Sequence, residues 1–441
     1  MKILALFAAL TLQAQSLKEA VNKASERYPS IKISREQVNE ASAAVNLART
    51  AFLPRVDATA QVNRATANNV FGLLFPNTVI PPISGPQIDG DQSRNVFGAA
   101  IGMLVTWEPF DFGRRQADVD AAAAGKARAE SSIARAKLDA GAAAADAYLS
   151  VVAAQQTVAA AQASLERYRQ FETIIDALAK AELRPGADLA RMQAERIVAE
   201  TNIIRAEQAV AQAKALLEQY TGEPVATIDS APFVRSAEPI KAASAAHPYL
   251  REQQFSIDEV ISRMKAIDKS WYPRFAAQAA AFGRGSGARV NGPFAGGGRG
   301  LYPDHGNWAV GFSATFPLLD YKALRARKEI ELQKQRKEEA RRELIERELA
   351  GRAAQARAQL DGAKRIAEIA PKQIAALQTA LDQTQARYKA GLGTLIEVAD
   401  AQRQLTQAEI ETSIARIAVW RAELSLAYAQ GDLDPFLARL P

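Results

Sequence analysis

The sequence contains two copies of one plan, and this repeat limits what the chain can fold into more than any other feature. Tyr-Pro at residues 28–29 recurs as His-Pro at 247–248, and Phe-Leu-Pro-Arg at 52–55 recurs as Trp-Tyr-Pro-Arg at 271–274, both at an offset of 219 residues. From residue 102 onward the halves align at an offset of 209, which a single ten-residue deletion explains. We therefore expect two tandem structural repeats.

Each repeat is predicted to contain a helix, two strands, a very long helix, a tight turn and a further helix. We place the first repeat at residues 15–222, with a leading helix at 17–50, and the second repeat at 223–435. The strand pairs fall at about 54–109 and 273–319, where apolar and polar residues alternate as in a sheet with one apolar face. The alternating apolar positions include Val56, Ala58, Ala60 and Val62; Phe97, Ala99, Ile101, Met103 and Val105; and Trp308, Val310, Phe312 and Ala314.

A helix of unusual length follows each strand pair. Residues 111–183 contain no proline, and residues 320–391 contain only Pro371. At about 1.5 Å per residue, such a helix is roughly 110 Å long and needs helical partners along its length. The two shorter helices of each repeat together have about the same length, so we expect them to stack end to end against the long one. The helical pairs then fold back at residues 183–186 and 391–394.

Composition excludes several kinds of site. The chain has no cysteine and two histidines, which argues against cysteine nucleophiles, disulfides and nearly every zinc or iron–sulfur site. Because no acid–base–nucleophile arrangement is recognisable, we expect no enzyme activity, no cofactor and no metal. The 55 basic and 49 acidic residues are intermingled, which indicates solvated helix faces rather than a nucleic-acid surface.

Residues 1–14 are predicted to be a secretory signal peptide. Lys2 precedes an apolar stretch from Ile3 to Leu12, and residues 12–14 form a candidate cleavage site. The alternative is an apolar turn of helix at the N-terminus. No later segment reaches the ~18 apolar residues that a membrane-spanning helix needs. Export without such a helix favours the periplasm or the outer membrane.

Four strands cannot close a pore alone, because roughly eight are needed even for a barrel filled with side chains. An open sheet edge in lipid would leave backbone groups without hydrogen bonds. If the strands enter a membrane, the protein must therefore oligomerise. A trimer would supply twelve strands and a continuous tube of long helices.

Together these features resemble the TolC-type outer-membrane efflux protein family over nearly the whole chain. The resemblance rests on the tandem repeat, the aromatic-Leu/Tyr-Pro-Arg motifs, Trp-Glu-Pro-Phe-Asp-Phe-Gly at 107–113 and Arg-Tyr-Lys-Ala-Gly at 387–391. It implies a mainly α fold with a trimeric, twelve-stranded outer-membrane β-barrel, four strands per protomer, on a long periplasmic barrel of coiled-coil helices. It also implies an exit duct for efflux or secretion that docks an inner-membrane pump through a periplasmic adaptor protein.

The resemblance assigns gate residues near the second hairpin tip. Glu397 and Asp400 fall where the family has acidic residues at the periplasmic entrance, and on a helix they share one face. Tyr388 and Asp188 fall at positions that tie neighbouring coiled coils together by a hydrogen bond. Gly393 stands where related channels can carry an arginine, which puts the strength of this latch in question. On residue type alone, solvated helix charges are the better explanation of Glu397 and Asp400, and the position they share with the family favours the gate.

The resemblance also assigns adaptor docking to the two tips, whereas the residues alone indicate only helix ends. The tip residues are Leu183, Pro185 and Gly186 in the first repeat and Gly391, Leu392, Gly393 and Thr394 in the second. A different interpretation of the whole chain is a soluble periplasmic coiled-coil scaffold that conducts nothing. The four strands distinguish the two, because a scaffold would not need them. The exported substrate and the pump are not specified by these residues.

Overall fold

The computed structural model describes residues 15–66, 95–183, 185–229, 247–288 and 298–439. The chain is mainly helical and divides into two compact units, each described here by itself. The hairpin unit comprises residues 1–37, 129–254 and 341–441, and the sheet unit comprises residues 38–128 and 255–340. Among the described helices, none has a stretch both long and apolar enough to span a bilayer.

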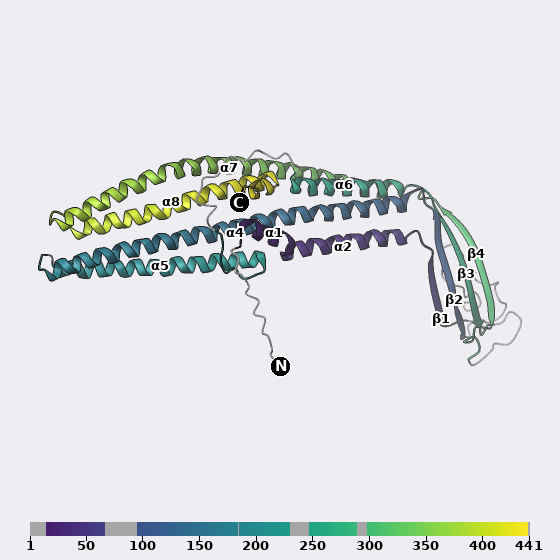
Figure 1. The fold of residues 1–441 in the computed structure, drawn as a ribbon. Coiled ribbons are helices and arrows are strands. Elements are labelled where there is room, and N and C mark those ends of the chain that lie inside the picture. The colour runs from purple at the N-terminus through teal and green to yellow at the C-terminus, as the bar shows by residue number, and fades with distance from the viewer. Residues whose placement is uncertain (1–14, 67–94, 184, 230–246, 289–297, 440–441) are drawn as a thin grey trace, which may run out of the picture. The chain divides into compact units, whose positions relative to one another are not determined.

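The sheet unit is built around one four-stranded antiparallel sheet in which strand order follows chain order (Figure 1). Its strands are β1 (Arg55–Thr66), β2 (Asn95–Phe110), β3 (Arg274–Ser286) and β4 (His305–Thr315). β2 and β3 lie in the middle, and β1 and β4 lie at the two edges. The long-range pairing therefore joins a strand pair from each half of the sequence.

One face of the sheet is apolar, and the other is largely polar or small but carries a buried apolar cluster of Ala100, Leu104, Ala280 and Phe282. Ala60 pairs with Ile101, Met103 with Ala281, and Ala277 with Phe312, so these side chains share one face. On that face Trp308 and Phe312 are 80% and 79% exposed. The opposite face includes Asp57, Thr59, Gln61 and Asn63 of β1, and the side chain of Gln278 donates to Thr106 Oγ1 at 3.2 Å. The predicted alternation is therefore present, and it gives the sheet two chemically different sides.

The leading helix predicted at 17–50 is wrong as a single element. The structure has α1 (Leu17–Arg27) and α2 (Pro29–Thr50), separated at Tyr28. Tyr28 has ψ 136°, outside the helical region, because the ring of a following proline disfavours helical geometry at the residue before it. In the second repeat, α6 covers Pro248–Lys269.

The two long helices are α4 (Arg114–Lys180) and α7 (Tyr321–Lys389), a few residues shorter than predicted at each end. Asp111 sets the start of α4: its Oδ2 accepts hydrogen bonds from Arg115 N at 2.8 Å and Arg115 Nε at 2.9 Å. Burial disfavours the carboxylate, but these hydrogen bonds outweigh it and hold the pKa of Asp111 below its usual value. Phe112 and Gly113 have φ of 53° and 83°, so the chain turns sharply before the helix begins. Pro371 lies inside α7, where it removes one helical hydrogen bond without ending the helix.

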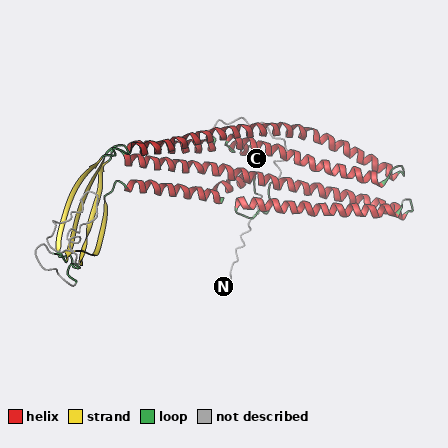
Figure 2. Cartoon of the chain, turned by 180° about the vertical axis from the view of Figure 1, so that it is seen from behind, coloured by secondary structure: helices red, strands yellow, loops and turns green. Residues whose placement is uncertain are grey.

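In the hairpin unit, α4 returns as α5 (Gly186–Thr221) and α7 returns as α8 (Leu395–Gln430), each through a short loop (Figure 2). A short α9 (Asp434–Leu437) follows. An apolar core joins α1, α4, α5, α8 and α9, and its fully buried members include Tyr148, Leu217 and Phe436. Distant parts of the chain therefore share one core in this unit.

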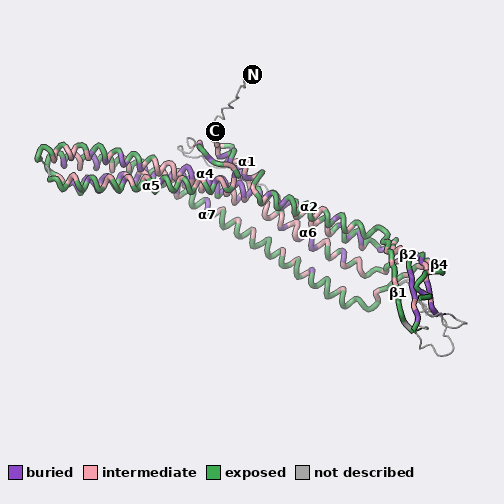
Figure 3. The backbone as a smooth tube through the Cα atoms, turned by 90° about the horizontal axis from the view of Figure 1, so that it is seen from below, coloured by how far each residue is buried: buried purple, intermediate pink, exposed green. Residues whose placement is uncertain are grey.

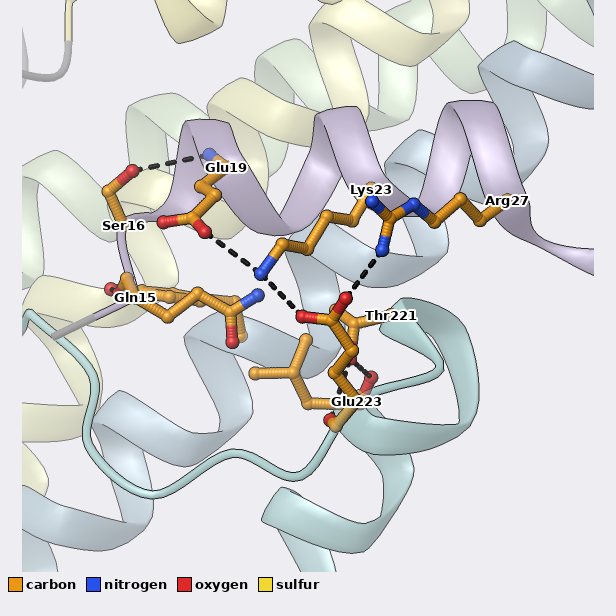
Figure 4. Close-up of polar contacts among 9 residues, drawn as sticks. Gln15, Ser16, Glu19, Lys23, Arg27, Thr221 and Glu223 are labelled. Atoms are coloured by element: carbon orange, nitrogen blue, oxygen red, sulfur yellow. Dashed lines mark hydrogen bonds and ion pairs between the residues drawn. The ribbon is translucent and has the colours of Figure 1, made fainter. Parts of the chain in front are cut away.

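The segment before α1 is tied into this unit (Figure 4). Gln15 forms an isolated parallel bridge with Ile228, and its carbonyl accepts a hydrogen bond from the Tyr148 hydroxyl at 2.8 Å. Lys23 Nζ lies 2.8 Å from both Glu19 Oε1 and Glu223 Oε2, and these hydrogen bonds raise the pKa of Lys23. Residues 1–14, predicted to be a signal peptide, lie outside the described residues.

Candidate functional site: the hairpin tips and the links between the hairpins

The two hairpin turns have the same backbone geometry at corresponding positions. After α4, Leu183 N donates to Leu178 O at 3.0 Å, and Glu182 has φ 60°. After α7, Leu392 N donates to Arg387 O at 2.8 Å, and Gly391 has φ 81°. Both ends are therefore Schellman-type caps with one left-handed residue. Glycine adopts this conformation without strain, whereas the Cβ of Glu182 makes it sterically unfavourable.

The predicted tip residues are exposed. Leu183 and Leu392 are 70% and 73% exposed. Pro185, Gly186, Gly391 and Thr394 are exposed as well, and Gly393 is half-buried. Each hairpin thus ends in an exposed leucine on a capped turn.

Behind the tips, four helices pack around one apolar cluster. It contains Phe171 and Ile175 of α4, Met192 of α5, Leu381 and Tyr388 of α7, and Leu395, Val398 and Leu405 of α8. Figure 3 shows the buried and half-buried positions that run along α4 and α5. Because the cluster draws on both hairpins, it holds α4–α5 against α7–α8 within one chain.

Tyr388 and Asp188 are brought together at the tip end of this cluster. The Tyr388 side chain is fully buried, and its hydroxyl donates to Asp188 Oδ2 at 2.9 Å. Its ring packs against Phe171, with centroids 5.6 Å apart. Asp188 is half-buried in the first turn of α5, so one polar bond links α7 to α5.

Glu397 lies in the first turn of α8, close to Gly393. Thr394 is the N-cap of this helix, and its Oγ1 accepts a hydrogen bond from Glu397 N at 3.4 Å. A Cβ on Gly393 would lie 3.3 Å from Glu397 Oε2, so the carboxylate folds back over the helix start. This is where the helix dipole favours a negative charge, and the geometry gives Glu397 a capping role whatever else it does.

The Asp400 carboxylate is paired, because Arg403 on the same helix forms an ion pair with its Oδ1. Arg403 Nη1 also lies 3.0 Å from Glu195 Oε1 on α5. The hydrogen bond with Asp400 raises the pKa of Arg403, so the guanidinium stays charged between the two carboxylates. Arg403 therefore links the α7–α8 hairpin to the α4–α5 hairpin and partly neutralises Asp400.

Two further polar links between the hairpins were not predicted from the sequence. Arg167 of α4 contacts Glu409 of α8 through two hydrogen bonds, at 3.0 and 2.7 Å. One turn earlier, Thr406 Oγ1 donates to Ser164 Oγ at 2.9 Å. Partners more than 200 residues apart leave no local pattern, and only the register of the helices brings them together. Among the described residues, these contacts form a set of polar links between the two hairpins.

Solved structures show which class of protein has this fold. The chain superimposes on a membrane protein from Pseudomonas aeruginosa with a TM-score of 0.74 and 20% identity, covering 94% of this chain and 90% of that one. It superimposes on the Campylobacter jejuni CmeC outer membrane channel with a TM-score of 0.72 and 13% identity, covering 94% and 85%. The open state of the Neisseria gonorrhoeae MtrE outer membrane channel gives a TM-score of 0.68 and 18% identity, covering 94% and 89%. The fold is that of outer-membrane channels.

The sequence places the chain within that class. Residues 20–223 and 240–432 match the family described as outer membrane efflux protein, and the chain belongs to this family. A search of curated proteins finds no significant match. The predicted family, mainly helical fold and non-enzymatic class are confirmed: the protein is an outer-membrane exit channel with a large periplasmic helical part.

Proposed function

We propose that three copies of the chain assemble into one duct, in which their sheets join into a twelve-stranded barrel. The observation that supports this most strongly is the sheet, with one apolar face, one largely polar face, and β1 and β4 as its edges. In lipid, these edges would leave backbone groups without hydrogen bonds. Pairing β4 of one copy with β1 of the next satisfies both edges and keeps the apolar face outward.

The periplasmic end of the duct is gated, in this proposal, by Tyr388, Asp188, Glu397 and Asp400. The Tyr388–Asp188 hydrogen bond and the Arg403–Glu195 ion pair support it, because separating the hairpins would break both. Glu397 and Asp400 from three copies would form a ring of six carboxylates at the entrance. Such a ring attracts cations and repels anions, although Arg403 weakens the share of Asp400.

The tips are proposed to dock a periplasmic adaptor protein, which in turn connects the duct to an inner-membrane pump. The exposed leucines on the two turns support this, since a docking site needs apolar side chains free of intramolecular cover. The docking residues are Leu183, Pro185, Gly186, Gly391, Leu392, Gly393 and Thr394. Because Leu183 and Leu392 occupy nearly equivalent turns, each copy would offer two similar contacts.

The organisation of the chain belongs to the same proposal. Residues 1–14 serve as a cleaved signal peptide, and residues 15–222 and 223–435 are two structural repeats. The recurrence of left-handed residues supports the repeats: Glu182 and Gly391 are 209 residues apart, as are the helix caps Gly222 and Gly431.

Cysteine cross-linking tests the assembly directly, because the natural chain has no cysteine. Gln61→Cys on β1 would be combined in turn with Asn307→Cys, Ala309→Cys and Gly311→Cys on β4, all on the polar face. We expect one combination to give disulfide-linked trimers in outer-membrane preparations, and detergent-extracted protein to conduct in planar bilayers. A monomer that needs no detergent and forms no cross-link would instead support the soluble scaffold.

A further inference from the structure

An apolar groove lies on the outer face of the sheet, at the ends of β2, β3 and β4 that adjoin the helices. Its volume is about 490 Å³, and the rings of Phe110, Phe275 and Phe312 line it. Smaller residues, Pro109, Ala276, Ser313 and Ala314, complete the lining. Phe110 pairs with Phe275, Phe275 with Ala314, and Ala277 with Phe312, so the rings share the apolar face. The groove is thus a depression in the surface that faces lipid.

A ladder of aromatic rings leads from this groove to a lysine. The ring centroids of Phe275 and Phe112 are 6.2 Å apart. The Phe112 ring stacks on the Tyr272 ring, with centroids 5.1 Å apart. The Nζ of Lys269, at the end of α6, lies 5.3 Å from the centre of the Tyr272 ring. Apolar, aromatic and cationic groups therefore follow one another, in the order that a lipid presents its acyl chain, glycerol region and phosphate.

The cationic end of the ladder is not neutralised inside the chain. Asp268, next to Lys269, is already paired with Lys328, at 2.7 Å. Within the described residues, Lys269 forms no ion pair with a carboxylate. Its ammonium group is therefore available to an external anion.

We propose that this groove binds one acyl chain of a phospholipid from the periplasmic leaflet, with Lys269 at its phosphate and a preference for an anionic headgroup. The inference rests on the proposed orientation of the sheet, with its apolar face toward lipid. A neighbouring copy is the other conceivable occupant. The continuity of the groove with the lipid-facing surface and its cationic end favour a lipid.

Two variants test the two halves of the site separately. Ala314→Phe fills the groove, and Lys269→Gln removes the cation. Their matched controls are Val310→Phe, which adds the same ring on the same face outside the groove, and Lys265→Gln, one turn earlier on α6. Purified protein would be titrated with phosphatidylglycerol or phosphatidylcholine, and bound lipid counted by native mass spectrometry.

We expect Ala314→Phe to lower occupancy by both lipids at least about tenfold. Lys269→Gln should weaken phosphatidylglycerol binding about fivefold, the contribution of one cation at a membrane surface, with little effect on phosphatidylcholine. Both controls should bind like the natural protein. If all four variants bind lipid equally, the site does not exist. If Ala314→Phe dissociates the oligomer and Lys269→Gln changes nothing, the groove is a contact between copies.

Oligomeric state and conductance of the natural protein, measured on the same preparations, separate this inference from the proposed function. A conducting trimer without lipid selectivity overturns only the lipid site. A non-conducting monomer overturns the duct, and the lipid site with it.

Discussion

The hydroxyl of Tyr388 can be removed without disturbing its ring, which makes Tyr388→Phe a clean test of the link between the hairpins. The hydroxyl donates to the Asp188 carboxylate at 2.9 Å from a fully buried side chain. A hydrogen bond to a charged group contributes about 1.5–3 kcal/mol. Asp188 is only half-buried, so water can replace the lost donor and the lower value applies. About 1.5 kcal/mol corresponds to a roughly tenfold shift toward separated hairpins in each copy.

Single-channel recording in planar bilayers measures this shift as basal conductance, which we expect to rise about tenfold. Tyr168→Phe is the matched control, because Tyr168 lies in the same apolar cluster and its hydroxyl forms no hydrogen bond within the described residues. The control should conduct like the natural protein. Equal conductance of Tyr388→Phe and the natural protein would show that the bond does not hold the hairpins together.

Three further perturbations address the tips and the entrance. Leu392→Asp should leave a folded oligomer but abolish export from cells, because a charge replaces the apolar contact at the tip; unchanged export would reject docking there. Glu182→Gly should raise the free energy of unfolding in denaturant by about 1 kcal/mol, because glycine removes the strain of the left-handed conformation. Gly391→Ala should lower it by a similar amount. A less stable Glu182→Gly variant or a more stable Gly391→Ala variant would contradict the turn geometry. Glu397→Ala should reduce cation selectivity more than Asp400→Ala, whose charge Arg403 already offsets; equal reversal potentials in both variants and the natural protein would place the selective ring elsewhere.

The family and the mainly helical fold with four strands were predictable because they depend on periodic patterns and ordered motifs. The break at Tyr28 was missed although Pro29 signals it, since proline disfavours helical geometry at the residue before it and is common at the first position of a helix. The Arg403–Glu195 ion pair was not predictable, since residues 208 apart meet only once the register of four helices is fixed. The Arg403 partner of Asp400 was overlooked although it lies three residues on, at the spacing of a helical ion pair. The roles of Tyr388, Asp188, Glu397 and Asp400 in gating remain predictions.

The parallel bridge between Gln15 and Ile228 limits the order in which parts of the chain can fold. Polypeptides emerge from a translocon in sequence order, so the N-terminal segment must wait for more than 200 further residues before its bridge partner arrives. Until then Lys23 and Arg27 lack Glu223, their common carboxylate, and Tyr148 lacks both backbone acceptors, at Gln15 and Asp229, in their final positions. The first repeat therefore cannot complete its own core by itself, because that core also needs α8 and α9, which are the last helices to be delivered.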